Sequence, residues 1–165
     1  LMTERPTPGR ILSEQDYGKH GVKVLKLSNG VAVYVKQTDY NTAQITMHLY
    51  ANRGTSLYPD SDVDNFPLIT NVVKDAGVGR FNASTLRKML ASKVVNVWPS
   101  IDDRTQSIEG SSSVRDLKTM MELTYLYFTQ PRKDSIAFRS LINRMRSFLT
   151  NREANPQVAY NDSSL

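Results

Sequence analysis

The sequence predicts an α+β domain in which helices pack on one face of an antiparallel sheet. Three segments with strand patterns precede the first helical segment, and two more strand segments lie between the helices. Strands grouped as hairpins, without strict strand–helix alternation, favour this architecture over a doubly wound parallel sheet. The 165 residues, of which 39% are hydrophobic, are enough for one domain with its own core.

The clearest strand signal is a hairpin near the amino terminus. Apolar residues dominate residues 23–28 and 31–36, and the dipeptide Asn29-Gly30 between them tolerates the positive φ angles of a two-residue type I′ turn. Residues 43–51 alternate apolar and polar side chains, which predicts a third strand with one buried face.

The domain boundary is predicted from composition. Residues 1–20 are rich in Pro, Gly, Glu and Lys and lack sustained periodicity, which predicts an extended arm or interdomain linker. Residues 21–165 then form a single α+β domain. No signal-peptide core opens the sequence and no obvious stop signal closes it, so we expect a fragment of a larger multidomain protein.

Helix signals follow the third strand. Ser61-Asp62 offers an N-cap, and a helix is predicted to close at Gly77. Its inward side chains are expected to be Phe66, Ile69, Val72 and Val73. A short helix over residues 84–91, with apolar Leu86, Met89 and Leu90, precedes two strands over residues 94–101 and 104–112.

Two longer helices complete the chain. Ser113, three residues before Asp116, resembles the start of a capping box, and Pro131 prevents the helix from continuing. The face expected in the core holds Leu117, Met120, Met121, Thr124, Tyr127 and Phe128. Asp134 is predicted to cap a last helix that ends near Arg152. Its apolar face is predicted to hold Phe138, Leu141, Ile142, Met145 and Leu149.

Composition limits the function classes. The sequence has no cysteine, which excludes disulfides and thiolate metal sites, and no run approaches the roughly 18 apolar residues of a membrane span. The net charge of +5 raises the possibility of a nucleic-acid partner. The basic residues of the last third are spread around a helix without the interleaved aromatic residues of single-strand binders, so we expect no nucleic-acid partner.

The chemical inventory predicts no catalytic, cofactor-binding or metal-binding residue in this chain. His20 and His48 lie far apart on an arm and a strand, where they cannot form a preorganised pair of metal ligands. Ser111 to Ser113 lack a nucleophile elbow, and Gly77-Val78-Gly79 close a helix where a phosphate loop would open one. The alternating Asp60, Asp62 and Asp64 lack the glycine and final glutamate of a calcium loop. Trp98, Tyr125 and Tyr127 could form a binding surface, although aromatic residues in such positions more often pack in the core.

Six segments taken together resemble the insulinase/pitrilysin family of zinc metallopeptidases. They are Leu27-Ser-Asn-Gly-Val-Ala-Val-Tyr-Val, Gly54-Thr-Ser-Leu-Tyr58, Ala76-Gly-Val-Gly-Arg-Phe81, Leu86-Arg-Lys-Met-Leu-Ala-Ser-Lys-Val-Val, Ile108-Glu-Gly-Ser-Ser-Ser-Val-Arg-Asp-Leu117 and Tyr125-Leu-Tyr-Phe-Thr-Gln-Pro-Arg132. The resemblance extends over nearly the whole chain from about Arg5, and it is greatest to the third domain of the long, PqqL-related bacterial members.

The resemblance implies a parent protein of two related halves, built from domains of the LuxS/mitochondrial-processing-peptidase-like metallohydrolase fold, which enclose peptide substrates in a chamber. Zinc is expected in another domain of the parent, held by an inverted His-x-x-Glu-His motif and a later Glu. A periplasmic or cell-envelope location is also implied. The expected partners are the other domains of the same polypeptide and the peptide substrate.

This sequence departs from the family pattern at the metal-binding helix. Residues 64–73, which follow the third strand, contain neither His nor Glu, and the later helix has Asn143, Arg144 and Arg146 near the place of the remaining ligand. We therefore expect a non-catalytic domain from the second half of a zinc metalloendopeptidase. The alternative is a structural or assembly subunit of the same fold, as the core proteins of the respiratory bc1 complex resemble peptidases without acting as such.

Overall fold

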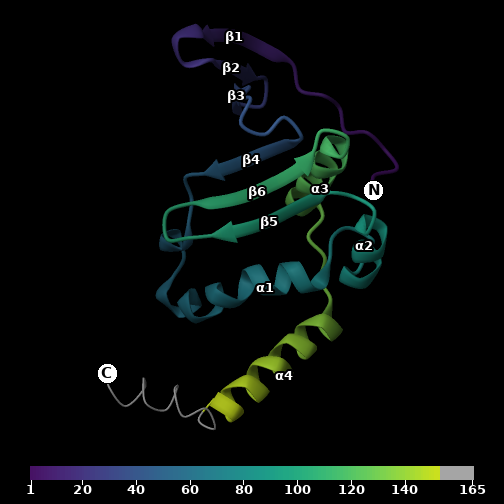
Figure 1. Cartoon of the computed structure of the whole chain (residues 1–165). Coiled ribbons are helices and arrows are strands. Elements are labelled where there is room, and N and C mark those ends of the chain that lie inside the picture. The colour runs from purple at the N-terminus through teal and green to yellow at the C-terminus, as the bar shows by residue number, and fades with distance from the viewer. Residues whose placement is uncertain (153–165) are drawn as a thin grey trace. The chain divides into compact units, whose positions relative to one another are not determined.

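The computed structural model describes residues 1–152, apart from the side chains of Val63, Asp64 and Pro67. The chain divides into two compact units, Leu1–Ile45 and Thr46–Leu165. Antiparallel sheets and helices occur together, which confirms the predicted α+β class (Figure 1). The last 13 residues of the predicted domain lie outside the described part of the chain.

The first unit is an antiparallel meander of three strands. It contains β1 (Ile11–Tyr17), β2 (Val22–Leu27) and β3 (Ala32–Lys36), with β2 in the middle, and the one-turn helix η1 (Gly18–His20) joins β1 to β2. The structure differs here from the predicted arm over residues 1–20. Every β1 residue is exposed, so no buried face marks the strand in the sequence, and its pairing with β2 alone defines it.

The β2–β3 pair is antiparallel as predicted, but the turn type is wrong. The Gly30 amide donates to the Leu27 carbonyl at 3.0 Å, which makes Ser28 and Asn29 the central residues of the turn. Only glycines have positive φ among the described residues, and Gly30 has a φ of 86°. A type I′ turn would need positive φ at Asn29 as well, so the loop has three residues and Gly30 occupies a bulge position.

The second unit is built on the sheet of β4 (Gln44–Ala51), β6 (Gln106–Ser113) and β5 (Val95–Ile101), in that order. β5 and β6 are antiparallel with Val97 opposite Gly110 and Trp98 opposite Glu109. Figure 1 shows β4 running in the direction opposite to β6. Because successive side chains point to opposite faces, Val97 and Gly110 share one face, and Trp98 and Glu109 share the other.

Two shorter helices lie between β4 and β5. α1 (Phe66–Ala76) ends at Gly77 as predicted, and α2 (Ala83–Leu90) is capped by Asn82, whose side-chain Oδ1 accepts from the Thr85 amide at 2.8 Å. The prediction that Ile69 points inward is wrong, since that side chain is 39% exposed.

The helix α3 (Leu117–Thr129) covers the sheet face that holds Val97 and Gly110. It begins four residues after the predicted start at Ser113, because residues 114–116 form a turn first. The predicted core face is also partly wrong: Met121 and Phe128 are exposed. The buried side chains are Thr119, Met120, Leu123 and Leu126. The helix is apolar on nearly every side, so packing against the sheet decides which face is buried.

The last helix, α4 (Ser135–Arg152), is capped by Asp134 as predicted. It packs mainly against α1 rather than on the sheet, where it was expected. Figure 1 shows α4 as an outer layer beyond α1. In residues 1–152, no helix has the length and hydrophobicity needed to cross a membrane.

The loop after β4 contacts the β5–β6 turn. It contains two short 3₁₀ helices, η2 (Thr55–Leu57) and η3 (Asp60–Asn65). The Thr55 amide donates to the Asp102 carbonyl at 2.9 Å, and the Ser56 amide to the Asp103 carbonyl at 3.0 Å. Gly54 approaches so closely that a Cβ there would lie 2.1 Å from the Asp102 oxygen. Only glycine fits this contact.

Candidate functional site

The helix that the family resemblance assigns to zinc binding is α1, the first α-helix after β4. Its described residues are Phe66, Leu68, Ile69, Thr70, Asn71, Val72, Val73, Lys74, Asp75 and Ala76. Asp75 is the one acidic side chain among them, and the Arg144 guanidinium of α4 pairs with it. The α1–α4 contact is therefore an ion pair beside apolar packing.

The two histidines lie in different units of the chain. His48 lies on β4 with its Nδ1 3.7 Å from Glu109 Oε1, and His20 lies in η1 of the first unit. Within residues 1–152 no group of three or more His, Asp or Glu side chains converges. A catalytic zinc needs three protein ligands around an open position. The described residues therefore do not fit the zinc that the family implies.

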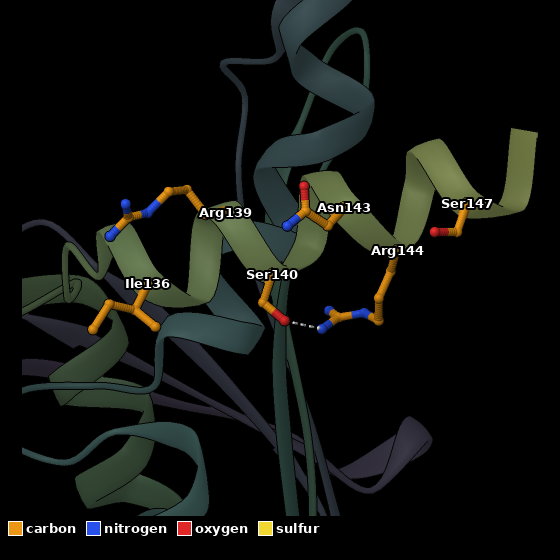
Figure 2. A pocket seen from close by; sticks show the side chains of 6 residues that line it. All are labelled: Ile136, Arg139, Ser140, Asn143, Arg144 and Ser147. Atoms are coloured by element: carbon orange, nitrogen blue, oxygen red, sulfur yellow. Dashed lines mark hydrogen bonds between the residues drawn. The ribbon is translucent and has the colours of Figure 1, made fainter.

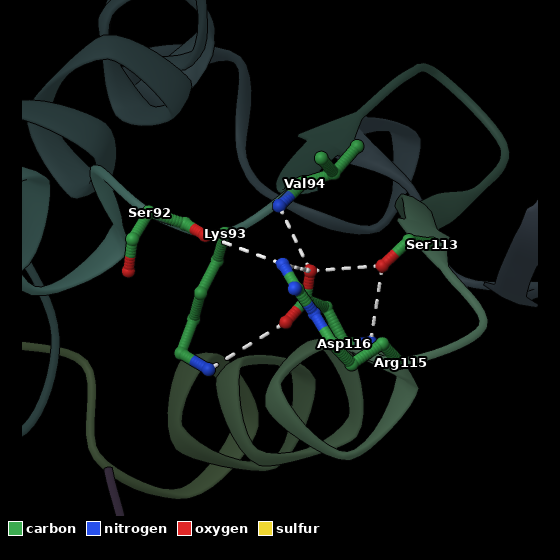
Figure 3. Close-up of polar contacts among 6 residues, drawn as sticks. All are labelled: Ser92, Lys93, Val94, Ser113, Arg115 and Asp116. Carbon is green, nitrogen blue, oxygen red and sulfur yellow. Dashed lines mark hydrogen bonds and ion pairs between the residues drawn. The ribbon is translucent and has the colours of Figure 1, made fainter.

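Among the described residues, the most enclosed charged group is Asp116, which is 2% exposed (Figure 3). Its Oδ2 accepts from the Val94 amide at 3.0 Å and from the Ser113 hydroxyl at 2.8 Å. Lys93 Nζ and an Arg115 guanidinium nitrogen each lie 3.6 Å from the carboxylate. The group therefore joins the start of β5 to the turn before α3.

These contacts explain why the pKa of Asp116 is lowered. The Val94 amide hydrogen bond, and then that of Ser113, lower the pKa from its ordinary value of 3.8 against the opposing effect of desolvation. The two cations act in the same direction as the hydrogen bonds. Because each contact stabilises the ionised form and the side chain is nearly closed to solvent, we interpret Asp116 as structural rather than catalytic.

The predicted capping box is half formed. The Asp116 amide donates to the Ser113 hydroxyl at 3.2 Å, as a capping box requires. The carboxylate does not return to the Ser113 amide, which donates instead to the Val94 carbonyl at 2.9 Å. Val94 lies 22 residues before Asp116, and no local sequence signal links the two residues.

We predict that Asp116→Asn lowers the Tm at neutral pH by roughly 5 °C, because the Val94 amide loses a charged acceptor. A lowered folded-state pKa contributes stability above the unfolded value of 3.8, and that contribution is lost as pH falls through the folded pKa. The Tm difference should therefore be constant at neutral pH and shrink below about pH 4. Melting curves between neutral and acid pH measure it, with the exposed Asp39→Asn as control. A difference that grows toward acid pH would contradict this account.

The sheet face opposite α3 is a candidate binding surface. His48 and Tyr50 on β4 have ring centroids 5.8 Å apart, His48 pairs with Glu109 on β6, and Glu109 lies opposite Trp98 on β5. These four side chains, named here the sheet-face row, cross all three strands and are between 42% and 63% exposed. Such a row of ring and polar groups can contact a polypeptide by stacking and hydrogen bonding. Single-sequence reasoning missed it because the cross-strand register was unknown.

The other aromatic candidates separate in the structure. Tyr125 and Tyr127 lie on α3, on the opposite side of the sheet from Trp98, and burial raises the pKa of Tyr127. They do not form one surface with Trp98.

The remaining candidate residues lie at the end of α1, on β6 and in η3. Gly77 ends α1 with a φ of 83°, and Val78 is fully buried. Ser113 supports the turn before α3, whereas the buried Ser112 hydroxyl has no partner among the described residues. Asp60 and Asp62 lie in η3, and the side chain of Asp64 is outside the described residues.

Two hollows lie at the surface. The first, of about 700 Å³, is lined only by α4 residues, and Figure 2 shows their side chains along that helix. They are Ile136, Arg139, Ser140, Asn143, Arg144 and Ser147. One helix supplies no second wall, so this hollow does not enclose a ligand. The second, of about 740 Å³, lies where Thr55 and Phe66 meet the β5–β6 turn, and it is also open to solvent.

Comparison with known proteins defines the class to which the chain is related: zinc proteases. No protein-family model matches the sequence. The related proteins are of the PqqL type. A zinc protease PQQL-like protein of Arabidopsis thaliana is 29% identical over 129 residues, which are 78% of this chain and 11% of that protein. The probable zinc protease PqqL of Haemophilus influenzae is 25% identical over 113 residues, which are 68% of this chain and 12% of that protein. The predicted resemblance to PqqL-related members of the insulinase family is confirmed.

Solved structures show the same fold. The periplasmic protease PqqL from Escherichia coli matches 98% of this chain with a TM-score of 0.77 and 17% identity. The ferredoxin protease FusC, solved in complex with Arabidopsis ferredoxin, matches 99% with a TM-score of 0.77 and 12% identity. The chain spans 18% of each of these proteins and about a tenth of the sequence relatives.

Proposed function

We propose that this chain is a non-catalytic domain of a longer zinc-dependent metallopeptidase, in which it helps to form the chamber that encloses peptide substrates. The observation that carries the proposal is the α1–α4 contact. Where the resemblance places a metal-binding helix, Asp75 is held by Arg144 and the neighbouring side chains are apolar. A carboxylate that is ion-paired with a guanidinium is less available as a metal ligand.

The parent protein is proposed to be periplasmic or in the cell envelope and to bind zinc in another domain. The relation to zinc proteases of the PqqL type supports the peptidase class, and the small share of their length supports further domains. The sheet-face row is the surface that we assign to the chamber, because it is exposed and can meet an extended peptide.

The experiment compares this chain with its parent protein, both purified without a histidine tag. We expect no stoichiometric zinc and no hydrolysis of unfolded peptides by the 165-residue chain. We expect about one zinc per parent polypeptide and cleavage that a chelator abolishes. Metal analysis and a fluorogenic peptide assay provide the two readouts.

The alternative, an assembly subunit without peptidase activity, predicts a parent with neither zinc nor cleavage. The non-catalytic assignment would be overturned by tightly bound zinc in the isolated chain that is lost in His48→Ala. The matched variant His20→Ala shows whether any loss is particular to the His48–Glu109 pair.

A further inference from the structure

The helix α4 carries an apolar stripe that is only partly covered. The stripe, named here the α4 stripe, consists of Phe138, Leu141, Ile142, Met145, Phe148 and Leu149. Leu141 is 7% exposed, whereas Phe138 is 46%, Leu149 57% and Phe148 69% exposed. α1 is the main packing partner of α4 in the described structure. The packing that buries Leu141 therefore does not extend to the two ends of the stripe.

The same helix has a strongly unbalanced charge. Residues 135–152 contain Arg139, Arg144, Arg146 and Arg152 and no acidic residue. Arg144 pairs with Asp75, and Arg139 donates to the Ser135 carbonyl at 3.3 Å. Arg146 is exposed and precedes Leu149 by three positions, so the two lie on neighbouring positions of the helix surface. An exposed apolar stripe bordered by positive charge is complementary to an apolar surface with an acidic rim.

We propose that the α4 stripe docks against an acidic, partly apolar surface of another domain in the parent protein. This inference rests on the proposed function only because it requires further domains in the parent protein. The greater length of the relatives supports such domains. A nucleic acid fits less well, because phosphates would meet the arginines and leave the phenylalanines and Leu149 in water.

The absence of cysteine from this sequence permits a direct test by thiol labelling. Leu149→Cys places a thiol on the α4 stripe, and Ser84→Cys places one on the exposed surface of α2 as a matched control. Both variants are made in the 165-residue chain and in the parent protein, and alkylation at each site is followed by mass spectrometry. We expect the two thiols to react at similar rates in the isolated chain. In the parent, we expect Leu149→Cys to react at least tenfold more slowly and Ser84→Cys to be unchanged.

A charge variant tests the chemistry of the partner. In the parent carrying Leu149→Cys, Arg146→Glu should restore fast alkylation and Arg146→Lys should not, because only the first opposes an acidic surface. Protection that survives Arg146→Glu would overturn the acidic partner. Equal labelling of Leu149→Cys in chain and parent would overturn the docking surface, as would protection that appears only when mixed-sequence DNA is added. The readout does not depend on proteolysis, so a parent without peptidase activity would refute the proposed function and leave this test intact.

Discussion

Replacing Gly77 by alanine is expected to lower the free energy of unfolding by about 3 kcal/mol. Gly77 has a φ of 83° and a ψ of −159°, a conformation that is essentially confined to glycine. An added Cβ would also lie 2.3 Å from the Phe81 carbonyl oxygen and 2.7 Å from the Ala83 nitrogen. Both neighbours are backbone atoms in the turn between α1 and α2, so neither can move aside as a side chain would. Urea denaturation measures the loss.

Gly79 in the same turn provides the matched control. Its φ of 56° is positive, but the nearest atoms to an added Cβ are in the side chains of Gln130 and Leu126, at 3.2 and 3.5 Å. Gly79→Ala should therefore cost roughly 1 kcal/mol, mainly for the left-handed conformation. If Gly77→Ala proves no more costly than Gly79→Ala, the close approach at Gly77 is not present in solution.

Replacing Met120 by alanine is the second change with a large expected effect, a loss of roughly 2–5 kcal/mol. Met120 is fully buried under the sheet. A Cβ on Gly110 of β6 would meet its sulfur at 2.9 Å and the Met47 methyl group at the same distance. Truncation would therefore leave a cavity between α3 and two strands.

The neighbouring Met121 is the control, because it has the same side chain on the same helix but is 49% exposed. Met121→Ala should change the free energy of unfolding by only about 0.5 kcal/mol. Urea denaturation of the two variants distinguishes the observed face of α3 from the face that the sequence predicts. The predicted face holds both methionines, so comparable losses for the two variants would favour it.

Local signals in the sequence predict much of the fold. Gly77 ends α1, Asp134 caps α4, and Asn29-Gly30 joins two paired strands, because each signal acts over a few residues through backbone conformation or a cap. Where the outcome depends on distant residues, prediction is weaker. The buried face of α3 is set by contact with β5 and β6, and α4 packs on α1, where Arg144 pairs with Asp75.

The candidate site shows the same division. The pairing of Ser113 with Asp116 could be predicted from their spacing. The hydrogen bond from the Val94 amide to the Asp116 carboxylate could not. The alternation of β4 predicts that His48 and Tyr50 share a face, but placing Glu109 and Trp98 beside them requires the strand order and register. The family resemblance predicted the class of related proteins, which single residues could not.

The first unit has no buried residue: every side chain of its three strands is exposed or half-buried. A small meander without a core opens locally at little cost in free energy, so its amide protons should exchange with solvent before those of β5, β6 and α3. Trp98, the only tryptophan in the sequence, lies in the second unit. Its fluorescence therefore follows the unfolding of the second unit, whereas amide exchange in β1, β2 and β3 follows the opening of the meander, so each event has its own probe.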